Sequence, residues 1–457
     1  METHHHKRSA FSGKLGFVLS AAGASVGLGN IWRFPYLAAK YGGGIFLLIY
    51  IILAFTFGYT MIMAETALGR MTKKSPVGAF SAFGKGPGLS FGGWINAIIP
   101  ILIVPYYSVI GGWVIKYLVE YLRGGGSALA LDGYFSEFIS GGVSVELCFV
   151  VFTLFTLGII YAGVRNGVER VSKCMMPVLA VLSVIIAVYS VTRPGALAGV
   201  KYFLVPNLDN FSWMTVVSAM GQMFYSLSIA MGILITFGSY MKKDVSIEGS
   251  TTNVEIFDTA IAIMAGLMII PAVFAFSGGD PDTLQAGPAL MFITIPKVFD
   301  SMGMGTVVGV MFFLLVLFAA VTSSIALTES AVSTFEDELG WKRHKSTLLI
   351  GVIMLALGSL SALGYGPLAG VTVFGMQFLD LFDFLTNSVM MPIAAIATCL
   401  LVSRVVGVDK IEEEVTQNGG QFRRKAVFNF MIRYLCPLFA AIILVSSVAN
   451  ALGWIKM

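Results

Sequence analysis

Apolar runs recur along the whole chain, separated by short gaps rich in glycine, proline and charged residues. Most runs have about 20 residues or more, which is enough to cross roughly 30 Å of hydrocarbon as an α-helix. The alternating pattern of transmembrane β-strands is not seen, so an all-α polytopic membrane protein is expected. The pattern predicts eleven spans, near 13–36, 43–70, 91–122, 146–163, 167–191, 213–240, 255–278, 305–334, 346–363, 376–403 and 427–454.

Composition supports this reading and excludes several classes of protein. Of the 457 residues, 57% are hydrophobic and only 12% are charged, whereas globular domains carry roughly a quarter charged residues. A soluble enzyme or a nucleic-acid binder is therefore a poor fit, and no nucleophile elbow, metal-binding His/Glu helix or phosphate loop is found. The four cysteines are scattered and indicate no metal site. The run of histidines at 4–6 is better explained as tail than as metal ligands.

Charge placement predicts the orientation. Lysine and arginine cluster in alternate gaps between the apolar runs, and such gaps face the cytoplasm by the positive-inside rule. We expect a multi-pass protein of the plasma membrane with a cytoplasmic N-terminus and an outer C-terminus. The predicted units are a polar tail at 1–12, a five-helix repeat at 13–191, a second repeat at 213–403 and an eleventh helix at 427–454.

The first and sixth predicted spans contain residues that interrupt a helix in mid-membrane. Span one has Gly23, Gly27 and Gly29, and span six has the run 226–228 followed by Gly232. Two interrupted segments five spans apart indicate two inverted five-helix repeats with a ligand site between the breaks. The alternative is that small residues only permit close helix packing.

Polar groups near these breaks suit an amino-acid zwitterion accompanied by a cation. Half-helix N-termini offer N–H groups to an anion, and freed carbonyls offer oxygens to a cation. Asn30, Ser226 and Asp258 are candidate oxygen donors. The hydroxyls of 322–324 interrupt a long apolar run, although such groups also bond to their own backbone.

Ionisable residues within the membrane are costly, so each is a functional candidate. Glu65 is expected to accept backbone N–H groups from a broken helix rather than to carry protons. Arg33 and Asp383 could pair as an outer gate. On the inner side, Arg8 could pair with Asp337.

These features resemble the neurotransmitter:sodium symporter family, prokaryotic branch, along essentially the whole chain. The motifs that carry the resemblance are Gly27-Leu28-Gly29-Asn30-Ile31-Trp32-Arg33-Phe34-Pro35, Gly42-Gly43-Gly44, Tyr106-Tyr107, Gly221-Gln222 through Ser228, and Thr322-Ser323-Ser324-Ile325-Ala326.

The resemblance implies the leucine-transporter-type fold, with spans one to five inverted against six to ten, and two sodium sites. The first sodium would be held by Ser25, Asn30, Ser226 and Asp258. The second would be held by Gly23, Val26, Ala319, Thr322 and Ser323. It also implies that the segment between Gly167 and Pro177 unwinds to let water reach the second sodium from the cytoplasm.

The resemblance also places the substrate. Its carboxylate would meet the N–H groups of Leu28 and Gly29 and the phenol of Tyr107, and its amine would lie near Ser25, Tyr225 and Ser228. The side chain would contact a largely apolar set without a charged member, namely Ile103, Tyr107, Tyr225, Met231, Ser323 and Leu327. A charged side chain would enter this set without a partner, which is costly.

The expected function is sodium-coupled import of neutral hydrophobic L-amino acids, aliphatic or aromatic, by alternating access. Asp258 stands where many relatives have asparagine, and its fixed charge predicts that no chloride is needed. Proton coupling through Glu65 or Asp258 is an alternative, as are a channel and a non-transporting amino-acid sensor. The expected partners are the amino acid and lipid, with no nucleic acid and no obligate protein partner.

Overall fold

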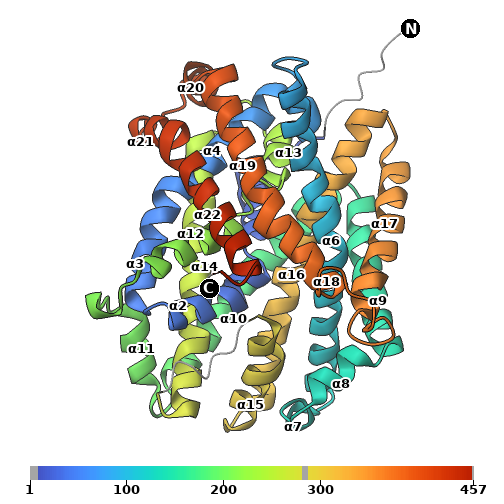
Figure 1. The fold of residues 1–457 in the computed structure, drawn as a ribbon, viewed down its shortest axis with the longest axis vertical. Helices are drawn as coiled ribbons and strands as arrows, with labels where there is room; N and C mark the ends of the chain where they lie inside the picture. The colour runs from blue at the N-terminus through green and yellow to red at the C-terminus, as the bar shows by residue number, and fades with distance from the viewer. Residues whose placement is uncertain (1–8, 280–286, 455–457) are drawn as a thin grey trace.

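The computed structural model describes residues 9–279 and 287–454 as a bundle of helices (Figure 1). Within these ranges no β-strand occurs, and only an isolated bridge joins Val373 and Met376. Nine helical segments there are long and apolar enough to cross a membrane: α3–α4 (Gly44–Thr72), α6 (Pro87–Leu122), α9 (Val143–Tyr161), η3–α10 (Val164–Val191), α14 (Ile247–Ser277), α16 (Gly305–Leu339), α17 (Arg343–Leu363), α18–η8 (Phe378–Val406) and α21–α22 (Lys425–Ala451).

The first predicted span is broken where its glycines lie. Helix α1 (Lys14–Ser25) ends, residues 26 and 27 are irregular, and the chain resumes through Leu28 as a helical segment over Gly29–Lys40 that includes α2 (Phe34–Lys40). The two halves are bent by 56° and together form a tenth candidate span in the described part of the chain. The predicted break around Gly27 is confirmed.

The sixth predicted span, 213–240, is broken as well. Helix α12 (Trp213–Ser226) and α13 (Ile233–Tyr240) are separated by six irregular residues. Ser228, Ala230 and Gly232 there have φ values of 53°, 59° and 68°. Left-handed backbone is unfavourable for residues other than glycine, so the surrounding structure must hold this segment in place.

Glu65 holds that segment. It lies in α4 (Tyr59–Thr72), its side chain is fully buried, and Oε1 accepts a hydrogen bond of 2.8 Å from the backbone N–H of Ala230. An unpaired backbone N–H in a membrane interior costs several kcal/mol. The expectation that Glu65 accepts a backbone N–H from a broken helix is confirmed.

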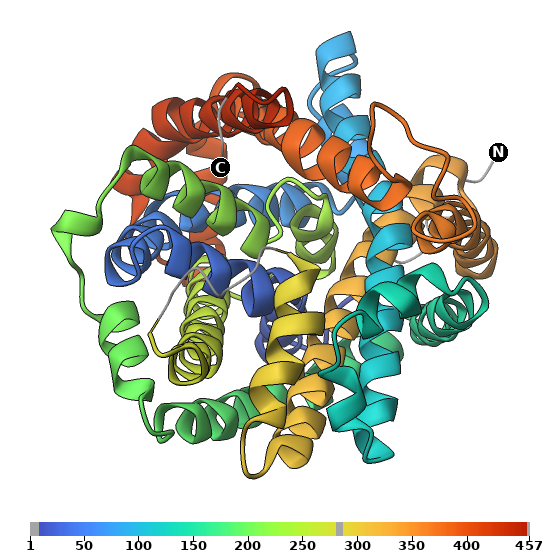
Figure 2. The same ribbon diagram turned by 60° about the horizontal axis from the view of Figure 1, so that its bottom comes forward.

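The two broken segments lie at the centre of the molecule. Figure 2 shows the first span, in blue, enclosed by helices from later parts of the chain. Helix α1 packs against α10, α14 and α16, and α12 packs against α3 and the second half of the first span. Short helices cap the bundle; these are α5 (Pro76–Ser81), α7 (Gly126–Leu129), α8 (Tyr134–Ser140), α11 (Ala196–Leu204), α15 (Ile295–Asp300) and α20 (Val408–Thr416).

Candidate functional site

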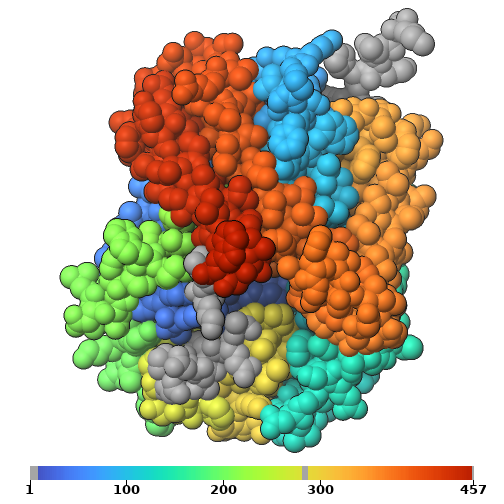
Figure 3. All heavy atoms as spheres, in the orientation of Figure 1, coloured from blue at the N-terminus to red at the C-terminus, as the bar shows by residue number. Residues whose placement is uncertain are grey.

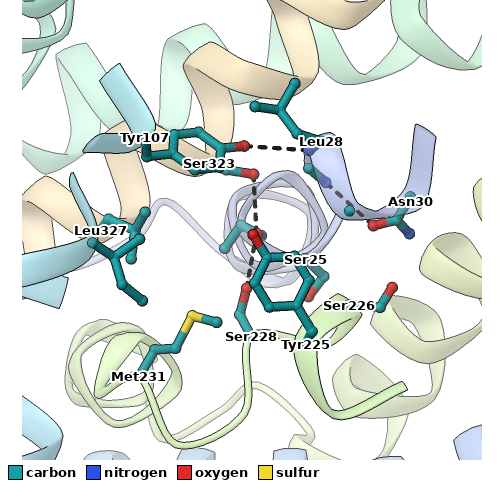
Figure 4. Close-up of a pocket in the computed structure, with 14 residues that line it drawn as sticks. Ser25, Leu28, Asn30, Tyr107, Tyr225, Ser226, Ser228, Met231, Ser323 and Leu327 are labelled. Carbon is teal, nitrogen blue, oxygen red and sulfur yellow. Dashed lines mark hydrogen bonds between the residues drawn. The ribbon is translucent and has the colours of Figure 1, made fainter. Parts of the chain in front are cut away.

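A small cavity of about 30 Å³ lies between the two breaks (Figure 4). Every residue predicted to contact the substrate lines this cavity. Figure 4 shows Met231 and Leu327 on one side of this space and Asn30 and Ser226 on the other, so the cavity has an apolar end and a polar end. Its lining is Ala24, Ser25, Gly27, Leu28, Gly29, Asn30, Ile103, Tyr107, Tyr225, Ser226, Ser228, Met231, Ser323 and Leu327.

Asp258 lies behind the polar end and contacts two residues that line it. Its carboxylate is fully buried in α14 and accepts hydrogen bonds from the Asn30 amide at 2.8 Å and from the Ser226 hydroxyl at 3.0 and 3.1 Å. The Tyr50 phenol, which sequence reasoning missed, lies 3.3 Å from Asp258 Oδ2 and donates to it. Three of the four residues predicted for the first sodium therefore meet in one hydrogen-bonded group.

Ser25, the fourth predicted residue, lines the same cavity at the end of α1. Its hydroxyl turns back and donates to the Ala21 carbonyl at 3.1 Å. This is the usual behaviour of a serine in a helix, so Ser25 would meet a ligand through its backbone, as the resemblance implied.

A second group of oxygens lies on the opposite side of the first break. The Ser323 hydroxyl is 3.2 Å from the carbonyl of Gly23 and 3.4 Å from that of Val26. Next to it, the Thr322 hydroxyl lies 3.2 Å from the carbonyl of Ala319. All five residues predicted for the second sodium are therefore brought together between α1 and α16.

Both groups consist of hydroxyl, amide, carbonyl and carboxylate oxygens. A hard cation prefers such ligands, so the residues present fit sodium. Among the described residues no cluster of three His, Cys, Asp or Glu side chains could hold a metal ion.

The backbone at the first break faces the cavity with its donors. The N–H of Leu28 donates to the Tyr107 phenol at 3.3 Å, and the N–H of Gly27 donates weakly to Asn30 at 3.4 Å. A Cβ at Gly27 would lie 2.8 Å from Ser323 Oγ, and one at Gly29 would overlap the Tyr225 ring. Glycine is needed here because a larger residue would collide with the side chains of Ser323 or Tyr225.

Met231 and Leu327 form the apolar end (Figure 4), and Ile103 adds another apolar side chain to the lining. None of the residues that line the cavity is lysine, arginine, aspartate or glutamate. Ser228, in the second break, donates its hydroxyl to the Ala24 carbonyl at 2.9 Å. The predicted amine contact at Ser228 would therefore share or replace this bond.

A larger cavity of about 430 Å³ lies outside the Tyr225 ring. Arg33 and Asp383 both line it, but they do not form the predicted ion pair. The Arg33 guanidinium instead lies 5.3 Å from the centre of the Tyr225 ring. Asp383 accepts from the Tyr106 phenol at 3.2 Å and from the Asn387 amide at 2.6 Å, two partners that sequence reasoning missed. Arg33 and Asp383 therefore line one cavity without a direct ion pair between them.

The opposite side is closed by the segment before α1. Phe11 is buried and donates its N–H to the Tyr240 carbonyl at 3.1 Å. The N–H of Ser12 donates to Glu169 at 2.9 Å, and Lys242 donates to the carbonyl of Ser12 at 2.9 Å. The chain here closes the end of the bundle opposite the larger cavity.

A buried ion pair adds to this inner closure. Arg343, at the start of α17, pairs with Glu329 in α16, and the Tyr240 phenol donates to Glu329 at 2.7 Å. Of the inner pair predicted from the sequence, Asp337 lies in α16, but Arg8 lies outside the described residues. Their pairing stays a prediction.

The predicted unwinding element is helical in this structure. Gly167 lies in a π-helical turn, η3 (Val164–Glu169), and Pro177 lies inside α10 (Arg170–Val191). A Cβ at Gly167 would overlap the Ile159 carbonyl, which gives this glycine a packing role as well. Unwinding between the two residues stays a prediction.

Comparison with known proteins agrees with this geometry. The model of the sodium:neurotransmitter symporter family matches residues 8–125 and 127–454. The chain is 34% identical over 441 residues to a protein of Bacillus subtilis named uncharacterized sodium-dependent transporter YhdH, covering 95% of this chain and 96% of that one. It is 30% identical over 461 residues to an uncharacterized sodium-dependent transporter of Haemophilus influenzae, covering 98% and 100%.

The fold matches a solved transporter. The crystal structure of MhsT in complex with L-phenylalanine superposes with a TM-score of 0.86 at 33% identity, covering 96% of this chain and 100% of that chain. The leucine-transporter-type fold with broken first and sixth helices, expected from the sequence, is thereby confirmed.

Proposed function

Because the chain belongs to the sodium:neurotransmitter symporter family and is therefore a sodium-dependent membrane transporter, we propose that its substrate is a neutral L-amino acid with an apolar side chain. The observation that carries this proposal is the cavity between the breaks, whose lining combines the backbone N–H of Leu28 and the Tyr107 phenol with the apolar side chains of Ile103, Met231 and Leu327. MhsT, which shares the fold, was solved with L-phenylalanine.

The substrate carboxylate is proposed to replace the bond between the N–H of Leu28 and the Tyr107 phenol, so that both groups donate to it. Its charge would lie at the half-helix N-terminus that begins near Gly29, where an anion is favoured. Lysine or glutamate would place a second charge against the apolar end, where it has no partner. Burying such a charge costs several kcal/mol, which favours a neutral side chain.

Two sodium ions are proposed to accompany the substrate. One would lie among Ser25, Asn30, Ser226 and Asp258, next to the substrate carboxylate, and the hydrogen bonds that now join these side chains support this placement. The other would lie among Gly23, Val26, Ala319, Thr322 and Ser323, where the Ser323 hydroxyl already approaches two carbonyls of span one. Since Asp258 supplies a fixed negative charge, no chloride is needed.

Alternating access is proposed to work by exchanging the open outer side for the closed inner side. The outer cavity reaches the Tyr225 ring, while Phe11 and the pair of Arg343 with Glu329 close the other end. With the N-terminus in the cytoplasm, as the charge pattern favours, this structure faces outward. Uptake would then proceed from the outside to the cytoplasm.

Binding of the twenty amino acids to the purified protein, with sodium or potassium as the only cation, tests the proposal. Apolar amino acids should bind in sodium and fail to bind in potassium. A preference for lysine, glutamate or an amine without a carboxylate would refute the substrate assignment.

A further inference from the structure

An ion pair outside the cavity and the gates lies near the proposed first sodium site, on the side that the charge pattern predicts to face the cytoplasm. Residues 408–425, here called the connecting segment, join the tenth and eleventh predicted spans and lie at the upper edge of the face in Figure 3. Arg424, near the end of the segment, forms two parallel hydrogen bonds of 3.1 and 2.8 Å to the carboxylate of Glu255. Glu255 lies in α14 and is fully buried.

The same guanidinium also contacts the second span. It donates to the Phe55 carbonyl at 3.2 Å and lies 3.5 Å from the centre of the Tyr59 ring. Phe55 belongs to a π-helical turn, η2 (Ala54–Gly58), between α3 and α4. Arg424 therefore bridges two helices that belong to different repeats.

These two helices also meet at the first sodium site. Asp258 follows Glu255 by three residues in α14, and Tyr50 precedes Phe55 by five residues in the second span. The Tyr50 phenol donates to Asp258 at 3.3 Å. One helical turn covers 3.6 residues, so the bridge through Arg424 lies about one turn from the contact between Tyr50 and Asp258.

The chemistry of the bridge suits a positioning role. A bidentate pair of arginine and carboxylate fixes orientation as well as distance. A buried carboxylate in a membrane helix is costly without a partner, so Glu255 depends on Arg424. The neighbouring residue, Arg423, provides a contrast: among the described residues its guanidinium hydrogen-bonds Gln421 and no group of α14.

We propose that Arg424 is a positioning residue for the first sodium ion, because through Glu255 and Phe55 it fixes the spacing of the helices that carry Asp258 and Tyr50. The inference rests on the proposed sodium site at Asp258. It predicts that sodium affinity depends on a side chain that does not touch the ion.

Equilibrium binding of radioactive sodium to the purified full-length protein tests this inference. Arg424→Gln should raise the half-saturating sodium concentration about tenfold, the lower end of the effect seen when partners of metal ligands are removed. Arg424→Lys keeps the charge but loses the bidentate geometry, so an intermediate value is expected. Arg423→Gln makes the same chemical change one residue away and should bind sodium as the wild type does.

Further variants separate the possible failures. If Asp258→Ala, which removes the ligand oxygen, binds sodium as well as the wild type, the sodium site itself is wrong. If Asp258→Ala weakens binding but Arg424→Gln does not, or if Arg423→Gln weakens it equally, the positioning role is refuted. A pair that only stabilises the fold would lower the melting temperature without shifting the sodium titration, which also refutes it. Should Arg424→Gln fail to fold, Glu255→Gln is expected to give the same weakening, and unaltered binding would overturn the inference.

Discussion

The side-chain amide of Asn30 donates a hydrogen bond of 2.8 Å to Asp258, across 228 residues of sequence. It joins the broken first span to α14. Asn30, which lines the cavity, is therefore hydrogen-bonded to the buried carboxylate of Asp258. A cation bound there would replace this hydrogen bond and would be shared by the amide oxygen of Asn30 and the carboxylate of Asp258.

The fixed charge of Asp258 predicts that transport does not need chloride. Wild-type uptake in proteoliposomes should be the same in sodium chloride and sodium gluconate. Asp258→Asn removes the charge, so this variant should either lose transport or respond to chloride. Ser226→Ala removes a neutral partner of the same carboxylate and should produce no chloride response. Wild-type transport that stops in gluconate would contradict this prediction.

The second sodium is predicted to depend on the paired hydroxyls of Thr322 and Ser323. Replacing both by alanine removes two oxygens and keeps helix propensity, so sodium affinity should fall by about tenfold or more for loss of two ligands. Ser324→Ala is the matched control, because the hydroxyl of Ser324 faces Thr156 and lies outside the predicted site. Sodium titrations of substrate binding provide the measurement. An unchanged sodium dependence in the double variant would refute this sodium site.

Glu65 distinguishes sodium coupling from the proton-coupled alternative. In Glu65→Gln the remaining carbonyl oxygen can still accept from the N–H of Ala230, so sodium-driven uptake should persist. Glu65→Ala leaves this N–H without a partner and should destabilise the protein by about 1–3 kcal/mol. Sodium-driven uptake and the free energy of unfolding, measured for both variants, test these two expectations. Uptake that is driven by a pH gradient and lost in Glu65→Gln would favour proton coupling.

Pro177 is predicted to weaken α10 where the second sodium leaves for the cytoplasm. Proline lacks an N–H and clashes with the preceding turn, so Pro177→Ala should strengthen the helix. Turnover in proteoliposomes should slow, while equilibrium substrate binding stays unchanged. Pro100→Ala, which replaces an interior proline of α6, controls for a general effect. Equal turnover in Pro177→Ala and the wild type would leave Pro177 as an ordinary kink.

Much of the centre of the molecule could be predicted from local sequence. The break at Gly27 could be predicted because several glycines lie close together in an apolar run. Glycine loses more conformational freedom than other residues when it enters a helix, so it weakens the helix at that point. Thr322 and Ser323 could be identified as candidates because they are polar residues in the middle of a long apolar run. The expected role of Glu65 followed from the cost of an unpaired N–H in the membrane.

Partners that are distant in sequence could not be predicted. Tyr50 reads as an ordinary aromatic residue in an apolar run, and only the fold brings it to Asp258. Arg70 and Glu414, which form a buried ion pair, are separated by 344 residues. The lack of a direct ion pair between Arg33 and Asp383 could not be predicted either, because two residues that line one cavity need not touch.

The central claim is that the cavity binds a neutral apolar L-amino acid together with sodium. Its most direct test is the binding of labelled L-leucine to the purified protein, in sodium and in potassium at equal ionic strength. We predict saturable binding in sodium alone, displaced by excess leucine, tyrosine or tryptophan and unaffected by lysine or glutamate. Equal binding in potassium, or displacement by lysine, glutamate or a carboxylate-free amine, would contradict the account.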